Sequence, residues 1–277
     1  MKDNKKHKKA EYGILITGLI ILLAAACIIA LCAGQYSVSV PEVIKILASR
    51  FVNVTKTWSN TAEGVVFTLR LPRIIGAVLV GSALSLSGAA YQGVFKNPLV
   101  APDLLGVSSG ACVGASVAIL LHLNSFGVQA MAFVAGTLAV GLTLFIPRLI
   151  KNTNMTMLVL SGIIVKGIMD SVMGIIKYVA DPETELQSIT YWQLGSLTKV
   201  LPKDLFTVGP VIVAASVIIF LLRWRINILS LGDREAKTLG VSVTVVRNFI
   251  IICATLLTAS AVCISGTIGW IGLVIPH

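Results

Sequence analysis

The sequence has few charged residues for its length: 12% of its 277 residues are Asp, Glu, Lys or Arg, whereas 56% are hydrophobic. The mean hydropathy of +0.92 is far above what a soluble domain needs to bury its core. The chain is therefore predicted to be an integral membrane protein. Its net charge of +10 does not favour nucleic-acid binding, because the basic residues stand in short clusters at the ends of apolar runs.

Motifs for catalysis and for nucleotide binding are also missing. The sequence has no Gly-Lys dipeptide, so it contains no Walker A loop, and its three histidines are scattered without a Ser/His/Asp set. The cysteines lie inside apolar segments without metal-ligand spacing, and they are interpreted as small hydrophobic residues: Cys27, Cys32, Cys112, Cys253 and Cys263. An integral membrane enzyme is disfavoured, no cofactor or metal bound by this chain is expected, and any ATP hydrolysis must come from a partner.

Apolar runs bounded by polar residues or by Pro and Gly predict membrane spans along the whole chain. They fall near residues 12–34, 65–92, 104–122, 128–149, 156–180, 205–223 and 244–265, and a further span begins around Gly269. The first run, Ile14 to Ala33, is long enough to cross a bilayer and is interpreted as a retained span and not as a signal peptide. The fold class is therefore all-α and polytopic, with residues 1–277 forming a single transmembrane domain.

The distribution of basic residues predicts the orientation. Five lysines precede the first span and place the N-terminus in the cytoplasm: Lys2, Lys5, Lys6, Lys8 and Lys9. The outer side then carries fewer basic residues, diluted by acidic ones. Two long outer segments, 35–63 and 181–203, are each predicted to contain a short surface helix.

A short polar stretch, Ser230 to Val243, lies between two apolar runs on the predicted cytoplasmic side. Ser230 and Asp233 resemble a capping-box start, Ala236 and Leu239 share one predicted helix face, and Gly240 is a natural stop. The spacing predicts a two-turn helix that is too short to be stable alone.

The fifth span contains ionisable residues at membrane depth, where charge is costly and by default marks a functional site. Lys166, Asp170 and Lys177 share one helical face by their spacing. The alternative, which we favour, is that Lys166 and Asp170 neutralise each other while Lys177 reaches the outer surface.

Small residues in the second span predict close helix packing: Gly76, Gly81, Gly88 and Gly93. There is also a faint internal repeat, because "SGAAYQGVFKNP" (87–98) and "SGTIGWIGLVIP" (265–276) match at Ser, Gly and Pro. A true duplication at these spans would have inverted topology, as in many transporters.

Four motifs, in order, resemble one known family. They are "RLPRIIGAVLVGSALSLSGAAYQGVFKNPLVAPDLLGVSSGA" (70–111), "YWQLGSL" (191–197), "LGDREAKTLGV" (231–241) and "GTIGWIGLVIPH" (266–277). The chain resembles the FecCD type of ABC transporter permease, which imports ferric siderophores, haem and cobalamin. The resemblance implies a ten-span type II importer fold, of which about seven and a half spans are present here.

The resemblance also implies functional residues. The loop 227–240 would form the coupling helices that dock on an ATPase subunit, with the family motif matched by Gly232, Asp233, Ala236, Leu239 and Gly240. Arg70 and Arg73 match arginines that receive acidic residues of a binding protein, although anchoring to lipid phosphate is an open alternative. Asn154, Met155 and Thr156 match the segment that narrows the path on the cytoplasmic side.

Family members continue for two more spans after "PH", so the sequence is expected to be either a fragment or a truncated permease. The implied assembly is a bacterial cytoplasmic-membrane importer with a second permease (identical or sister), two ATPase subunits that carry ATP and Mg, and an extracytoplasmic binding protein. The implied cargo is a ferric siderophore, then haem or cobalamin. An ion-gradient-driven secondary transporter and a non-transporting membrane scaffold remain alternatives.

Overall fold

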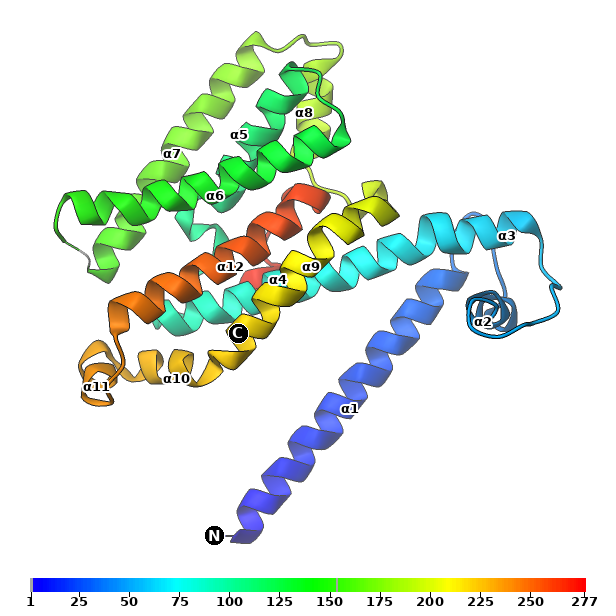
Figure 1. The fold of residues 1–277 in the computed structure, drawn as a ribbon, viewed down its shortest axis with the longest axis horizontal. Coiled ribbons are helices and arrows are strands. Elements are labelled where there is room, and N and C mark those ends of the chain that lie inside the picture. Colours follow the sequence, from blue (N-terminus) through cyan, green and yellow to red (C-terminus); the bar gives the residue numbers. More distant parts are fainter. Residues whose placement is uncertain (1, 153) are drawn as a thin grey trace. The chain divides into compact units, whose positions relative to one another are not determined.

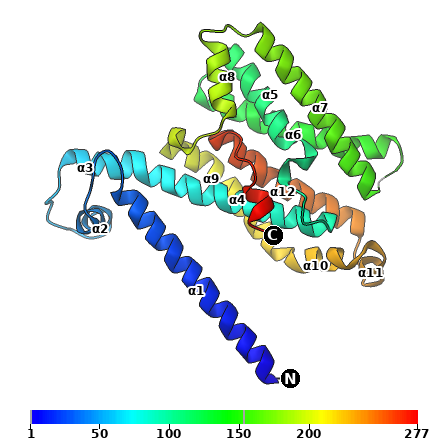
Figure 2. The same cartoon turned by 180° about the vertical axis from the view of Figure 1, so that it is seen from behind.

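The computed structural model is helical along most of the chain, and it describes residues 2–152 and 154–277, with side-chain surroundings given from Glu11 onward. Within these residues, six helices are long and apolar enough to cross a membrane, and the helix Val107–Leu120 is apolar but shorter. All seven apolar runs predicted as spans are thus helical, and the predicted all-α class is confirmed. The chain forms two compact units, Met1–Ile75 and Gly76–His277 (Figures 1 and 2). The side chains of the N-terminal lysines lie outside the described residues.

The first unit consists of a long helix followed by short ones: α1 (Lys2–Cys32), α2 (Val40–Ala48), α3 (Asn60–Gly64) and a π-helical turn, η1 (Val65–Arg70). The helix predicted between residues 35 and 63 is confirmed as α2, whose first turn contains Pro41. It buries Val43 and Ile46 in a small hydrophobic cluster with Trp58.

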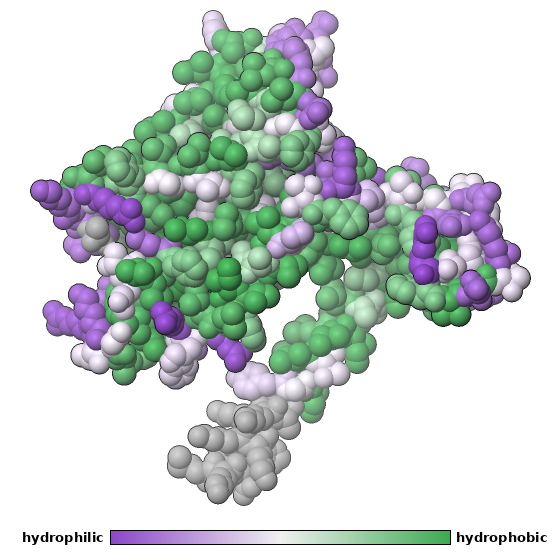
Figure 3. Space-filling view, viewed as in Figure 1, coloured by the Kyte–Doolittle hydropathy of each residue, from purple (hydrophilic) through white to green (hydrophobic). Residues whose placement is uncertain are grey.

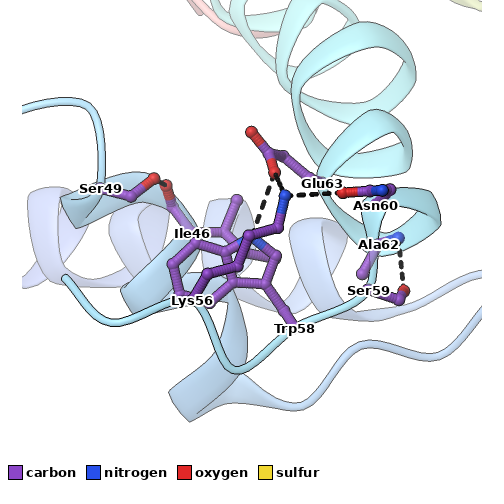
Figure 4. A network of polar contacts seen from close by, with 8 residues as sticks. All are labelled: Ile46, Ser49, Lys56, Trp58, Ser59, Asn60, Ala62 and Glu63. Atoms are coloured by element: carbon purple, nitrogen blue, oxygen red, sulfur yellow. Dashed lines mark hydrogen bonds and ion pairs between the residues drawn. The ribbon is translucent and has the colours of Figure 1, made fainter.

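A polar network holds the turn that leads into α3 (Figure 4). Lys56 Nζ donates to Asn60 Oδ1 and to Glu63 Oε2, both at 2.7 Å, and Trp58 Nε1 donates to the same Glu63 oxygen at 3.3 Å. The Ser59 hydroxyl caps α3 by accepting the Ala62 backbone N–H at 3.0 Å. The loop before α3 is therefore fixed by side chains at both of its ends.

The π-helical turn η1 lies directly before Pro72. The Leu71 N–H bonds to the Val66 carbonyl, five residues back, instead of the usual four. A proline lacks an N–H and its ring crowds the carbonyl four residues earlier, so a wider turn at this point lets the helix continue into α4 (Leu71–Phe95).

The second unit contains the remaining helices, a large hydrophobic core and a smaller hydrophobic cluster that includes Cys112, Met173 and Ile189. After the residues 76–95 of α4 come η2 (Pro102–Leu105), α5 (Val107–Leu120), α6 (Ser125–Leu149), α7 (Met155–Val179), α8 (Glu185–Gln193), η3 (Leu197–Lys199), α9 (Pro202–Leu221), α10 (Arg223–Leu231), α11 (Asp233–Thr238), α12 (Val243–Ser265) and α13 (Ile271–Val274). The predicted helix in residues 181–203 is confirmed as α8. The face of this unit shown in Figure 3 is largely hydrophobic over the helices, as expected for a membrane protein, and hydrophilic residues gather toward its edges.

Helix α12 is the most deeply buried candidate span, with 78% of its most apolar window inside the protein. It packs against α5, α6 and α9. Two hydrogen bonds join it to α4: Tyr91 Oη to Thr255 Oγ1 at 3.2 Å, and Thr258 Oγ1 to Ser87 Oγ at 3.0 Å. Helices α4 and α12 are therefore a hydrogen-bonded pair within the second unit.

Three of the four glycines predicted to pack closely do so. A Cβ atom on Gly76 would lie 2.9 Å from Val200, one on Gly93 would lie 2.5 Å from Ile226, and one on Gly88 would lie 1.8 Å from the Gly272 carbonyl oxygen. Gly81 has no such neighbour within 4 Å, so its predicted packing role is wrong.

Candidate functional site

The polar stretch between α9 and α12 folds as two helices, α10 and α11, joined at Gly232 (Figure 1). The prediction that one helix starts at Ser230 is wrong, because the Ser230 hydroxyl donates back to the Asn227 carbonyl at 2.7 Å inside α10. The chain turns at Gly232, whose φ of 144° disfavours any side chain. Gly240 has a φ of 75° and ends the turn after α11, which confirms its predicted role as a stop.

Asp233 connects α11 to two other helices. Its two carboxylate oxygens accept hydrogen bonds from Arg247 Nη2 of α12 at 2.8 and 2.9 Å. Oδ1 also accepts from Lys96 Nζ, directly after α4, at 3.1 Å. The hydrogen bonds from Arg247 and Lys96 hold the pKa of the Asp233 carboxyl below its ordinary value, against a smaller opposing effect of burial.

Ala236 and Leu239, predicted to share one face of α11, differ in burial. Ala236 is fully buried in the main hydrophobic core, whereas 60% of Leu239 is exposed. Leu239 directly follows the last residue of α11, and its N–H still bonds to the Glu235 carbonyl at 3.2 Å. Ala236 thus fixes the helix to the protein, and Leu239 presents an apolar side chain outward.

Arg70 and Arg73, predicted as a pair, have different surroundings. Arg70 Nη1 donates to the carbonyl oxygens of Leu31 at 2.7 Å and Cys32 at 3.2 Å, and Nη2 donates to that of Tyr36. Arg70 therefore satisfies carbonyl groups left free at the end of α1. Arg73 makes no side-chain hydrogen bond or ion pair within the described residues, and it is partly exposed.

The three predicted gate residues lie at the start of α7. Asn154 is the residue before the helix, and its N–H bonds to Asn152 Oδ1 at 3.3 Å. Met155 packs against the main core, while Asn154 and Thr156 are exposed. The structure therefore brings them together at one helix end.

Lys166 and Asp170 lie near the middle of α7 with exposed side chains. Among the described residues no ion pair joins them, so the favoured expectation of mutual neutralisation is wrong. A lysine that precedes its acidic partner by four residues is also the less favourable order for an ion pair on a helix. Lys177 instead donates to Gln193 Oε1 of α8 at 2.6 Å.

The contacts of Arg247 and Lys96 with Asp233 were not predicted from the sequence, in which both residues only indicated the cytoplasmic side of the membrane. The only signal for Arg247 was a basic residue inside the first turns of an apolar span, and its side chain is 8% exposed. A charged group at such a position needs a partner, but the sequence alone did not identify Asp233 as that partner.

The comparisons with known proteins agree with the motif resemblance. The model of the FecCD transport family matches residues 21–277. The chain belongs to this family. Among solved structures, this FecCD protein is similar to one titled "An inward-facing conformation of a putative metal-chelate type ABC transporter", with a TM-score of 0.84, 34% sequence identity, and coverage of 96% of this chain and 80% of that one. The expected ABC permease fold is thereby confirmed.

Curated relatives carry different cargo names. The FecCD protein is 36% identical over 268 residues to the "Molybdate import system permease protein MolB" of Haemophilus influenzae, a match that covers 96% of this chain and 79% of the relative. It is 41% identical over 213 residues to a "Probable iron chelatin transport system permease protein" of Helicobacter pylori, which covers 77% of this chain and 64% of the relative. These relatives are transport permeases, and their names do not agree on one substrate.

Proposed function

We propose that this chain is the membrane-spanning permease subunit of a bacterial ABC importer in the cytoplasmic membrane, with its N-terminus in the cytoplasm. It works beside a second permease, receives cargo from an extracytoplasmic binding protein, and is driven by two ATPase subunits that hold the ATP and Mg. The chain itself binds no cofactor and catalyses no reaction.

One observation carries this proposal: the loop of α10 and α11 combines a buried attachment with an exposed apolar side chain. A six-residue helix is too short to be stable by propensity, so it depends on contacts outside itself. Ala236 supplies the contact with this chain, and the exposed Leu239 is suited to a groove on an ATPase subunit.

For the cargo, we propose a metal species that enters as a complex, with a ferric siderophore first and haem or cobalamin next. The relative named for iron chelatin supports the ferric siderophore. The haemin permease of Yersinia pestis, 35% identical over 240 residues, supports haem. Molybdate is the alternative that the Haemophilus influenzae relative favours.

We assign three further regions to this transport cycle. Arg73 receives an acidic residue of the binding protein, and Arg70 supports that surface by holding the end of α1. The segment Asn154 to Thr156 forms a cytoplasmic gate. Lys166 and Asp170 face a water-filled path or a partner helix, because charged side chains at the middle of a span are too costly to face lipid.

Co-purification with the candidate ATPase tests the proposal. Leu239→Asp is expected to abolish the complex that the wild-type permease forms. The matched control is Leu121→Asp, because Leu121 is equally exposed, at 61%, but follows α5 at its predicted outer end. Loss of binding in both variants, or in neither, contradicts the assignment of the loop.

Uptake into vesicles separates the remaining possibilities. A permease with ATPase and binding protein should take up radiolabelled ferric hydroxamate, haem, cobalamin or molybdate only when ATP is present. Uptake that follows an ion gradient without the ATPase would instead identify a secondary transporter, and no uptake of any probe despite a stable ATPase complex would favour a scaffold.

A further inference from the structure

Three segments of the second unit meet at the carboxylate of Asp233. Arg247 near the start of α12 contacts both of its oxygens, and Lys96 directly after α4 contacts one of them. A single guanidinium nitrogen, Nη2, makes both contacts with the carboxylate, and hydrogen bonds between charged partners are stronger than neutral ones. Within the described residues, these are the ionic contacts that α11 makes with other helices.

The surroundings make this contact firmer than a surface ion pair. The Arg247 side chain is 8% exposed, and its Nε has no hydrogen-bond partner in the described chain. The buried guanidinium therefore depends on Asp233 for compensation of its charge. Glycines with positive φ stand on either side of α11, at 232 and 240, where the chain turns into and out of the helix.

The two helices held by Asp233 are also joined to each other. Tyr91 bonds to Thr255, and Ser87 to Thr258, further along the same pair of helices. A displacement of α11 would thus move α4 and α12 together, and α12 contacts α5, α6 and α9. Packed helices with buried polar contacts move as units and do not deform gradually.

We infer that Arg247 and Lys96 are positioning residues for energy coupling: through Asp233 they transmit movement of the ATPase-docked α11 to the α4–α12 pair. This inference rests on the proposed docking of α11 on an ATPase. It separates two functions within one small helix, since Leu239 binds the partner and Asp233 passes the movement on.

A simpler role for Asp233 is to stabilise the N-terminal end of α11, where a negative charge or a capping oxygen is favourable. The two roles give different results on substitution. Asp233→Ser keeps a capping oxygen but loses both ionic contacts. If capping were the function, this variant would behave as the wild type, whereas a mechanical link would be lost.

The test uses the permease assembled with ATPase and binding protein in vesicles, with the labelled probe that wild type transports. Asp233→Ser and Arg247→Met are each expected to bind the ATPase with nearly wild-type affinity but to move roughly tenfold less cargo per ATP, since the ionic contact of the buried Arg247 is broken. The double variant should be no worse than either single one, because all three remove the same link. Lys203→Met, an exposed lysine at the start of α9, controls for loss of a positive charge.

Wild-type transport per ATP in Asp233→Ser would overturn the inference, and so would loss of ATPase binding as complete as in Leu239→Asp. A wild-type permease that binds no ATPase would show a failure of the proposed function itself, and the inference would be lost with it. If Asp233→Ser and Arg247→Met do not fold, Lys96→Met removes only the more exposed contact. Hydrogen exchange should then be faster in α11 of Lys96→Met than in Lys203→Met, and equal rates would again overturn the inference.

Discussion

Gly88 of α4 lies against the backbone of Gly272 in α13, so closely that a Cβ atom on Gly88 would be 1.8 Å from the Gly272 carbonyl oxygen. A second contact lies beside it, since Gln92 Nε2 donates to the Leu273 carbonyl at 3.0 Å. Both partners belong to the faint internal repeat, so the two similar segments pack against each other. This contact leaves no room for a side chain at position 88 of α4.

Gly88→Ala should therefore destabilise the protein. The new methyl group would meet backbone atoms, which cannot rotate away, so we expect a loss of about 1–3 kcal/mol in the free energy of unfolding. Thermal unfolding in detergent measures it. The matched control is Gly81→Ala on the same helix, where the added methyl group has no neighbour within 4 Å and the unfolding temperature should not fall. Equal unfolding temperatures for both variants would contradict the packing described here.

The glycine pattern shows what the sequence could predict. Spacing along one helix correctly indicated close packing at Gly76, Gly88 and Gly93, but it could not separate them from Gly81, because the deciding fact is the partner across the interface. The long spans were predictable from hydropathy alone. The π-helical turn before Pro72 was not, since it depends on how the helix accommodates a ring without an N–H.

Arg70 and Arg73 should respond differently to substitution. Arg73→Met is expected to weaken the affinity for the binding protein about tenfold, because it removes a contact with a carboxylate of that protein. It should not change the fold. Arg70→Met removes hydrogen bonds to the end of α1, so it should also expose residues 33–39 to limited proteolysis. Binding-protein affinity and protease sensitivity, measured on both variants, check this difference.

Arg70→Lys is the control for charge at that position. Lysine keeps the positive charge but cannot contact several carbonyl oxygens with a planar fork, so protease sensitivity should still rise. If Arg73→Met binds as wild type and Arg70→Lys shows a wild-type cleavage pattern, both assignments are wrong.

The site was less predictable than the spans because its key contacts join residues far apart in the sequence. Ser230 and Asp233 have capping-box spacing, yet Ser230 lies inside α10 and Asp233 binds Arg247, fourteen positions later. Lys166 and Asp170 have ion-pair spacing, yet both are exposed. Local spacing permits a contact, and the tertiary arrangement determines whether it forms.

Cysteine accessibility can test the environment of the charged face of α7. In a variant without the five native cysteines, Cys at position 166 or 170 should react with a charged, water-soluble thiol reagent in the assembled transporter. Ile168 is the control, because it is 52% exposed but lies about 200° around the helix from Lys166. Cys at 168 should stay unreactive in lipid. Equal reaction at all three positions would show that the face with Lys166 and Asp170 is no more accessible to water than the opposite face.

The pH dependence of stability follows from the lowered pKa of Asp233. A carboxyl group whose folded pKa lies below its ordinary value of 3.8 stabilises the fold fully above that value, and the contribution is lost as the pH falls through the lowered pKa. The charged groups that face it are Arg247 and Lys96, and its own helix adds Arg234, Glu235 and Lys237. The difference in unfolding temperature between wild type and Asp233→Asn should thus be constant from about pH 5 to about pH 8 and shrink only in stronger acid. The difference between wild type and Lys203→Met serves as the reference for general charge effects. A difference in unfolding temperature that changes near neutral pH would mean that Asp233 titrates there, and that the contact with Arg247 does not keep the carboxyl group ionised.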